Sequence, residues 1–200
     1  MAREDKVSKP GKADYPSLFF ETPEAFRSWL DVNHNTIPGI WLHLYKKGSA
    51  LKLINYYEAL DEALCYGWID GQLKAFDANS YIQKFTPRRK NSSWSKRNIE
   101  HIERLTKEGR MQPSGIIEVE RAKADDRWLK AYDPPSGMEV PEDFLRELAK
   151  DKKALDFFKT LNKANTYAIA WRLQTAKKPE TREKRIISFI QMLSRGEKFH

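Results

Sequence analysis

The sequence of 200 residues lacks most features by which enzymes and metalloproteins are recognised. Its single cysteine, Cys65, excludes an internal disulfide and any metal site built from several cysteines. The four histidines are scattered, and neither HExxH nor a regular carboxylate loop occurs, so we expect no metal site. GxGxxG, GxxxxGK[ST] and GxSxG are absent as well. We therefore expect no cofactor, and no nucleophile–base pair stands out.

Long hydrophobic runs are also missing. No apolar stretch approaches the ~20 residues needed to cross a bilayer, which predicts a protein without a transmembrane segment. The N-terminal MAREDKVSKPGKADYP has lysines but no apolar region behind them, unlike a secretory signal peptide. With 40% hydrophobic and 32% charged residues, the chain has the composition of a soluble folded protein. We expect a cytoplasmic location.

Positive charge exceeds negative charge, with 36 lysines and arginines against 28 acids and a net charge of +8. Such a protein is drawn to polyanions: nucleic acid, anionic lipid or a phosphorylated small molecule. One basic span lies near the C-terminus and could extend a basic face, although such spans are usually solvated. It contains Lys177, Lys178, Arg182, Lys184 and Arg185.

The hydrophobic pattern of the first 90 residues predicts the order α-β-α-β-β. Apolar residues at helical spacing favour helices at 21–33 and 55–67, each with a capping residue at its start. Residues 39–48 are β-branched and aromatic between two glycines, which is typical of a strand. Residues 68–76 and 80–85 resemble two antiparallel strands joined by a turn.

From Ser95 onward the pattern is helical, with a proline-containing linker at 132–141. The sequence thus predicts an α+β fold: a small antiparallel sheet with helices, followed by an all-α C-terminal helical unit. We expect a mobile leader at 1–17, an α+β domain at 18–132 and a helical region at 133–200, packed on the first as one body.

The stretch FTPRRKNSSWSKRN, residues 85–98, is the strongest candidate site. Between Lys84 and Arg97 it carries six basic side chains and no acid, and a helix is expected to begin near Ser95. A helix N-terminus and arginine forks both favour an anion, and aromatic side chains can wall a pocket. The predicted ligand-binding residues are Trp68, Asp70, Arg88, Arg89, Ser92, Ser93, Trp94, Ser95 and Asn98. In the alternative interpretation the basic residues are solvated, Trp94 packs in the core and Ser95 only caps a helix.

A second concentration is LCYGWIDG, residues 64–71. Cys65 would lie at the negative end of a helix dipole, which disfavours a thiolate and favours a buried thiol. Asp70 could be a pocket carboxylate, a turn former or, as we favour, a partner of Arg88 or Arg89. Asp61 and Glu62 are adjacent, so on a helix they diverge by about 100° and cannot form a catalytic carboxylate pair by themselves.

Several motifs in order carry a family resemblance: EAFRSWL, IWLHLYKKG, EALDEALCYGWIDG, FTPRR followed by SSWSKRN, EGRMQPSG and AKADDRW. Together they resemble the bacterial YdeI/OmpD-associated family, and AKKPETREKRI resembles its C-terminal bacteriocin-protection region, over about residues 18 to 196. The resemblance implies a small α+β domain followed by a helical segment, and a role in protection against bacteriocins or antimicrobial peptides. It implies no catalytic residue.

These observations favour a non-catalytic cytoplasmic binding protein for an anionic ligand, serving stress or antimicrobial resistance. One alternative is a nucleic-acid-binding protein, which the net charge favours. Another is an enzyme acting on a phosphate- or carboxylate-bearing substrate, with Asp70 as acid or base. In a fourth interpretation, Arg88, Arg89 and Asp70 form only a structural ion-pair network.

Overall fold

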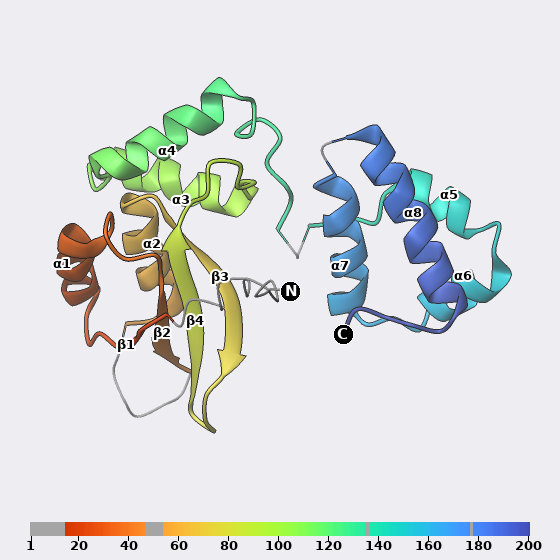
Figure 1. Cartoon of the computed structure of the whole chain (residues 1–200), viewed down its shortest axis with the longest axis horizontal. Helices are drawn as coiled ribbons and strands as arrows, with labels where there is room; N and C mark the ends of the chain where they lie inside the picture. Colours follow the sequence, from red (N-terminus) through yellow and green to blue (C-terminus); the bar gives the residue numbers. More distant parts are fainter. Residues whose placement is uncertain (1–14, 47–53, 135–136, 177) are drawn as a thin grey trace, which may run out of the picture. The chain divides into compact units, whose positions relative to one another are not determined.

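The computed structural model describes residues 15–46, 54–134, 137–176 and 178–200 (Figure 1). The chain divides into two compact units. Unit 1 extends to Ser92 and includes His101–Ala124, and unit 2 consists of Ser93–Glu100 and Asp125–His200. Within the described ranges, no helix combines the length and the apolar character needed to cross a membrane. The α+β fold followed by a helical region is confirmed.

Unit 1 contains a four-stranded sheet in the order β1-β2-β4-β3. Its strands are β1 (Ser17–Leu18), β2 (Ile40–Tyr45), β3 (Trp68–Ala75) and β4 (Ser80–Pro87). The β3–β4 pair is antiparallel, as predicted. The β2–β4 pair is antiparallel as well, whereas β1 runs parallel to β2 and makes the sheet mixed. The backbone of Pro16 also contributes, since its carbonyl accepts a hydrogen bond from the N–H of Trp41. Residues 1–14 of the expected leader lie outside the described residues.

Local capping determines where the helices of unit 1 begin. They are α1 (Pro23–Asn33), α2 (Tyr56–Cys65), α3 (Lys96–Lys107), which begins in unit 2, and α4 (Pro113–Ala124). The hydroxyl of Thr22 accepts a hydrogen bond from the N–H of Ala25 at the start of α1. Asn55 and Glu58 form the predicted capping box at the start of α2. These helix starts therefore follow from short-range side-chain chemistry.

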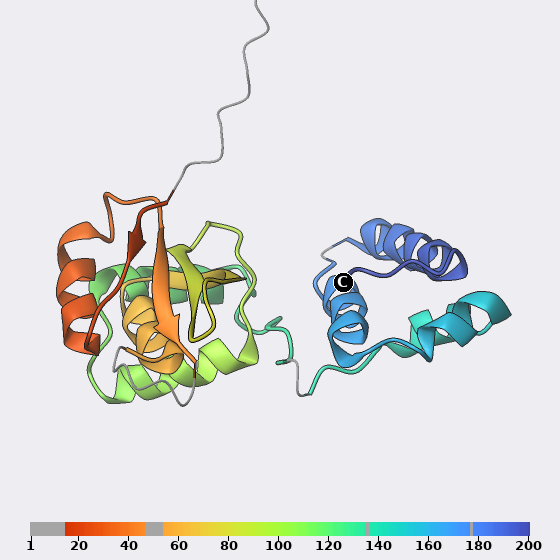
Figure 2. The same ribbon diagram turned by 90° about the horizontal axis from the view of Figure 1, so that it is seen from below.

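Helices α1 and α2 cover one face of the sheet (Figures 1 and 2). We call this the covered face; its fully buried strand residues include Ile40, Leu42, Leu44 and Phe85. Phe26 of α1 packs edge-on against Phe85, with ring centroids 6.1 Å apart. Because side chains alternate along a strand, the neighbouring residues of β2 point to the opposite side of the sheet.

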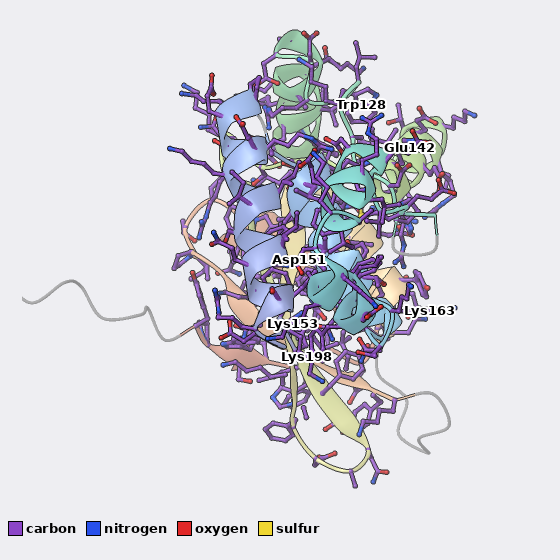
Figure 3. All side chains as sticks on the ribbon, turned by 90° about the vertical axis from the view of Figure 1, so that its right-hand side faces the viewer. Trp128, Glu142, Asp151, Lys153, Lys163 and Lys198 are labelled. Atoms are coloured by element: carbon purple, nitrogen blue, oxygen red, sulfur yellow. The ribbon has the colours of Figure 1, made fainter. Side chains whose placement is uncertain are left out.

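Unit 2 is all-α, as predicted. Its helices after the linker are α5 (Glu142–Leu148), α6 (Lys152–Phe158), α7 (Lys163–Gln174) and α8 (Pro179–Ser194). The continuous helical pattern of residues 142–162 forms two helices, because Asp151 begins a new one (Figure 3). Its carboxylate accepts a hydrogen bond from the N–H of Ala154 at 3.0 Å.

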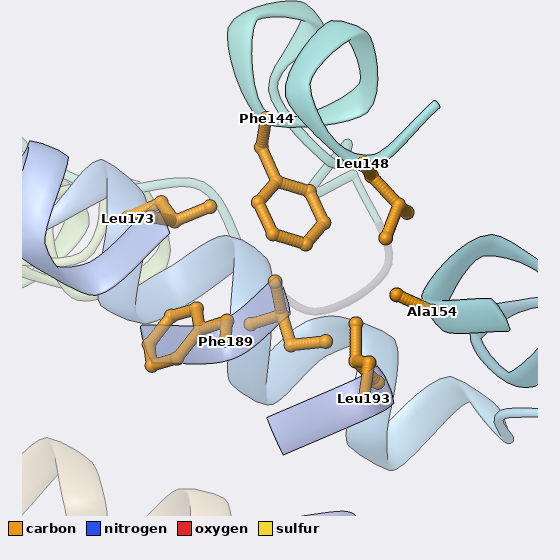
Figure 4. Packing of buried hydrophobic residues seen from close by; sticks show 7 residues of the cluster. Phe144, Leu148, Ala154, Leu173, Phe189 and Leu193 are labelled. Carbon is orange, nitrogen blue, oxygen red and sulfur yellow. The ribbon is translucent and has the colours of Figure 1, made fainter. Parts of the chain in front are cut away.

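The core of unit 2 brings residues of all four of these helices together (Figure 4). Its buried members are Phe144, Leu148, Ala154, Ile169, Leu173, Phe189 and Leu193. The buried side chain of Asn165 ties down the end of the chain, since its oxygen accepts hydrogen bonds from the N–H groups of Phe199 and His200. Unit 2 thus has a hydrophobic core of its own.

Two arginines of the basic span near the C-terminus have structural partners. Arg182 donates hydrogen bonds to both carboxylate oxygens of Asp143 and to the carbonyl of Leu173, near the end of α7. Arg185 donates to the carbonyl of Arg172. The interpretation of this span as a largely solvated basic face is therefore wrong for these two residues. Lys177 lies outside the described residues.

Candidate functional site

The side of the sheet opposite α1 and α2 is partly accessible and carries aromatic and basic side chains. Strand register places Trp41 opposite Lys84, and both His43 and Lys74 opposite Ile82. We call this side the open face, defined by Trp41, His43, Lys74, Phe76, Ile82 and Lys84. Apart from Trp41, these residues are half-buried or exposed. Much of the open face, as far as the structure describes it, is therefore accessible to solvent.

A pocket of about 520 Å³ lies at the end of this face where β3 begins and β4 ends. Among the described residues that line it, three are cations (Lys84, Arg88 and Arg89) and none is a carboxylate. Charges of one sign in a shared hollow create a field that attracts an ion of the opposite sign. The described residues of the lining are Tyr15, Pro38, Ile69, Gly71, Gln72, Lys84, Thr86, Pro87, Arg88, Arg89 and Ser92.

Two aromatic rings hold the ammonium group of Lys84 in this pocket. Its Nζ lies 4.4 Å from the ring centroid of Tyr15 and 5.7 Å from that of Trp41. Cation–π attraction of this kind positions the charge without neutralising it. Gly39 permits the close packing, because a Cβ there would come within 2.8 Å of the Tyr15 ring and 2.7 Å of the Thr86 methyl group.

The segment after β4 brings three of the predicted site residues, Arg88, Arg89 and Ser92, to the pocket. The N–H of Arg88 donates to the carbonyl of Gly67 at 2.9 Å, which anchors the start of the segment. The N–H of Arg89 donates to the hydroxyl of Ser92, and the N–H of Ser92 donates to the carbonyl of Arg89. Arg88 is buried, with 7% of its surface exposed, whereas Arg89 is exposed.

Two other predicted residues, Trp68 and Asp70, lie on the covered face. Trp68 is 1% exposed, and its indole N–H donates to the carbonyl of His34 at 3.0 Å. Asp70 accepts a hydrogen bond from the hydroxyl of Tyr56 at 2.9 Å. In the described part of the chain Asp70 forms no ion pair with Arg88 or Arg89. Its carboxylate binds the hydroxyl of Tyr56 in place of the arginine that the sequence favours. Strand alternation explains both placements, since the pocket is lined by Ile69 and Gly71 instead.

The remaining predicted residues, Ser93, Trp94, Ser95 and Asn98, belong to unit 2 and do not line the pocket. Trp94 is 1% exposed and packs against Trp128 with ring centroids 5.1 Å apart, so its ring offers no face to a base. Ser95 caps α3 by accepting a hydrogen bond from the N–H of Asn98. The N–H of Lys96 donates to the carbonyl of Tyr132. Two donors at this helix start are therefore already used.

A second cluster of charged residues lies between α1, α2 and the α3–α4 region, and sequence reasoning missed it. The buried carboxylate of Glu62 pairs with Arg27 at 2.7 Å and with Arg110 at 2.5 Å. Asp61 pairs with His101 and Arg104, and it also lies 4.0 Å from Arg110, which therefore contacts both adjacent acids. These residues are too far apart in sequence to form a recognisable motif. A cleft of about 300 Å³ lies beside them. Its described lining carries four acids and two arginines, so acids predominate there, unlike in the first pocket.

Electrostatics in this cluster suit a structural role. Burial alone would lower the pKa of Arg27, but the hydrogen bond and charge of Glu62 outweigh it and raise that pKa. Burial, aided by the nearby Glu62 charge, raises the pKa of the Cys65 thiol to about 11. This confirms Cys65 as a buried, protonated thiol. In the described ranges, no three His, Cys, Asp or Glu side chains gather as they would around a metal ion.

Two family models match the chain. Residues 18–118 match a domain of unknown function, DUF8412, and residues 137–196 match a model described as bacteriocin-protection, YdeI or OmpD-associated. The second match confirms the resemblance for the C-terminal region, whereas the N-terminal region matches a separate model. Apart from Tyr15, the residues that line the pocket lie within the first match. Neither the curated proteins nor the solved structures include a match to the chain.

Proposed function

Since the chain belongs to the DUF8412 family and continues into a bacteriocin-protection, YdeI or OmpD-associated region, we propose that it is a binding protein for an anionic ligand. The ligand occupies the open-face pocket, and binding serves protection against bacteriocins in the cytoplasm. Arg89 and Lys84 neutralise the anion, while Arg88 forms the deeper wall.

A single observation carries this proposal: the pocket is lined by three cations and no carboxylate. An exposed basic run would normally be screened by water and salt. In a hollow of about 520 Å³, several cations can instead act on one ion together, and arginine forks match phosphate or carboxylate oxygens. The volume lies within the usual range of small-molecule sites.

The lining also favours binding over catalysis. General bases and nucleophiles are most often histidines, carboxylates or cysteines. None of these is present among the described lining residues. Asp70, which would act as acid or base in the enzyme hypothesis, lies on the covered face. We therefore place Asp70 outside the binding site.

A thermal-shift screen tests the proposal. The purified protein is heated with inorganic phosphate, pyrophosphate or citrate, together with the variant Lys84→Gln/Arg89→Gln. A ligand that binds only the folded state raises the melting temperature with its concentration, by the mass-action increment. We expect this rise in the wild type and its loss in the double variant, because neither side chain is fully buried and the fold should persist.

The matched control is Lys107→Gln/Lys184→Gln, which removes two exposed charges outside the pocket and should keep the wild-type response. If the pocket variant and the control respond equally to every anion, the pocket is not the binding site and the proposal fails.

A further inference from the structure

The open face continues the positive charge of the pocket along the sheet. The ammonium group of Lys74 lies 4.2 Å from the ring centroid of Trp41. That of Lys84, the residue paired with Trp41 in the sheet, lies 5.7 Å from the same centroid. Trp41 is only 9% exposed, so it acts as a platform that holds the two charges in place. Two fixed cations therefore lie beside the pocket arginines on one surface.

No acid offsets this charge within the described strands. The only carboxylate in β2, β3 and β4 is that of Asp70. Asp70 lies opposite Phe85 in the β3–β4 register and is therefore on the covered face. The open face thus carries cations and neutral side chains alone along these strands. Its charge complements a ligand with several negative charges in a row.

The far end of the open face presents an aromatic ring. Phe76 is 60% exposed, and its ring contacts that of His43 edge-to-face at 4.5 Å between centroids. A hydrogen bond also holds the imidazole of His43, because its Nε2 lies 2.8 Å from the hydroxyl oxygen of Ser17. A supported but exposed ring of this kind is a surface on which a flat, apolar group can stack.

The distance between the two ends indicates an extended ligand. Strand β4 has eight residues, about 26 Å at roughly 3.3 Å per residue, and connects the level of Phe76 to the pocket. A single small anion would use only the pocket. A chain that alternates phosphates with flat bases would use the cations and the aromatic ring together. Stacking requires unpaired bases, because pairing in a duplex hides their faces.

We infer that the open face binds single-stranded nucleic acid, with a phosphate in the pocket and a base on Phe76. This inference rests on the proposed function, because it assigns the class of ligand that the anion pocket takes. The three accessible cations Lys74, Lys84 and Arg89 contact the backbone, and recognition depends on stacking more than on base sequence.

The test measures fluorescence anisotropy of labelled single-stranded DNA and RNA dodecamers, and of the matching duplex, over a range of salt concentrations. We expect the single strand to bind more tightly than the duplex at equal salt. Three phosphate contacts at about 0.7 each predict a log–log salt slope of roughly −2, and Lys74→Gln should reduce its magnitude by about 0.7.

Phe76→Ala separates this inference from the proposed function. It should weaken binding of the single strand about tenfold, as expected for loss of one stacked base, and leave pyrophosphate binding unchanged. The matched control is Tyr57→Ala, which removes an aromatic side chain of similar exposure, 58%, from α2 on the other side of the sheet. The control should bind the oligonucleotide as the wild type does.

Three results would overturn the inference while the anion pocket stands: pyrophosphate binding without oligonucleotide binding, preference for the duplex, or unchanged oligonucleotide affinity in Phe76→Ala. A protein that binds neither pyrophosphate nor any other anion at the pocket would instead overturn the proposed function.

Discussion

The guanidinium of Arg182 donates two hydrogen bonds, at 2.9 and 2.8 Å, to the carboxylate of Asp143, which lies 39 residues earlier in the chain. The same arginine donates to the carbonyl of Leu173 at 2.6 Å. It therefore joins α5 and α8 to the end of α7 in unit 2. A residue that the sequence places in a basic span is thus a part of the scaffold.

Replacing Arg182 by alanine should destabilise unit 2 by about 1–3 kcal/mol, because three hydrogen bonds are lost, two of them to a charged group. Chemical denaturation followed by circular dichroism measures this change. The matched control is Lys184→Ala, an exposed charge on the same helix, which should change stability little. Equal effects of the two variants would contradict a structural role for Arg182.

The same pair predicts a dependence of stability on pH. The hydrogen bonds from Arg182 lower the pKa of Asp143 below its ordinary value of 3.8. A group with a lowered pKa stabilises the fold fully above its unfolded pKa and loses this contribution as pH falls through the folded pKa. The stability difference between wild type and Asp143→Asn should therefore be constant near neutral pH and shrink below about pH 3.8. A difference that grew with acidity would contradict the assignment.

Gly115 should tolerate no side chain. It lies on α4 where this helix crosses the end of α2, and an added Cβ would overlap the carbonyl of Cys65 and come within 3.0 Å of the carbonyl of Leu64. Alanine gains about 1 kcal/mol of helix propensity, but overlap with backbone atoms costs more, so we expect net destabilisation of about 2–3 kcal/mol. Gly137→Ala, where nothing lies within 4 Å, is the control. A stabilised Gly115→Ala protein would show that the helices can separate.

Cys65 should be inert in the folded protein. Its side chain is fully buried, and a pKa of about 11 leaves roughly one thiol in a thousand ionised at pH 8. Ellman's reagent at pH 8 should therefore react slowly with native protein and rapidly once urea unfolds it. Fast, complete reaction under native conditions would contradict the buried environment.

Local chemistry explains which parts of the fold could be predicted. The caps at Thr22, Asn55 and Ser95 act within three residues, and each helix begins where its cap predicts. Strand β1 could not be predicted, because a strand of two residues shows no periodicity. Its residue Ser17 also pairs with Trp41, which is distant in sequence. The break between α5 and α6 could not be predicted, because apolar residues continue at helical spacing on both sides of Asp151.

The candidate site shows the same division. The sequence predicts Arg88, Arg89 and Ser92 as site residues because they lie close together in the basic run, and all three line one pocket. Trp68 and Asp70 lie on the covered face because alternation along β3 is set by packing against the helices, which no short motif reports. The Glu62 cluster joins residues 35 and 48 positions apart, a distance over which a sequence pattern carries no signal.

The most direct test of the anion pocket is a titration of isotope-labelled protein with pyrophosphate, followed by two-dimensional amide NMR. Binding at the pocket predicts saturable shifts centred on Gly71, Thr86 and Ser92 that vanish in Lys84→Gln/Arg89→Gln. Shifts centred on Arg27 and Arg110, or spread over lysines throughout the chain without saturation, would contradict the account.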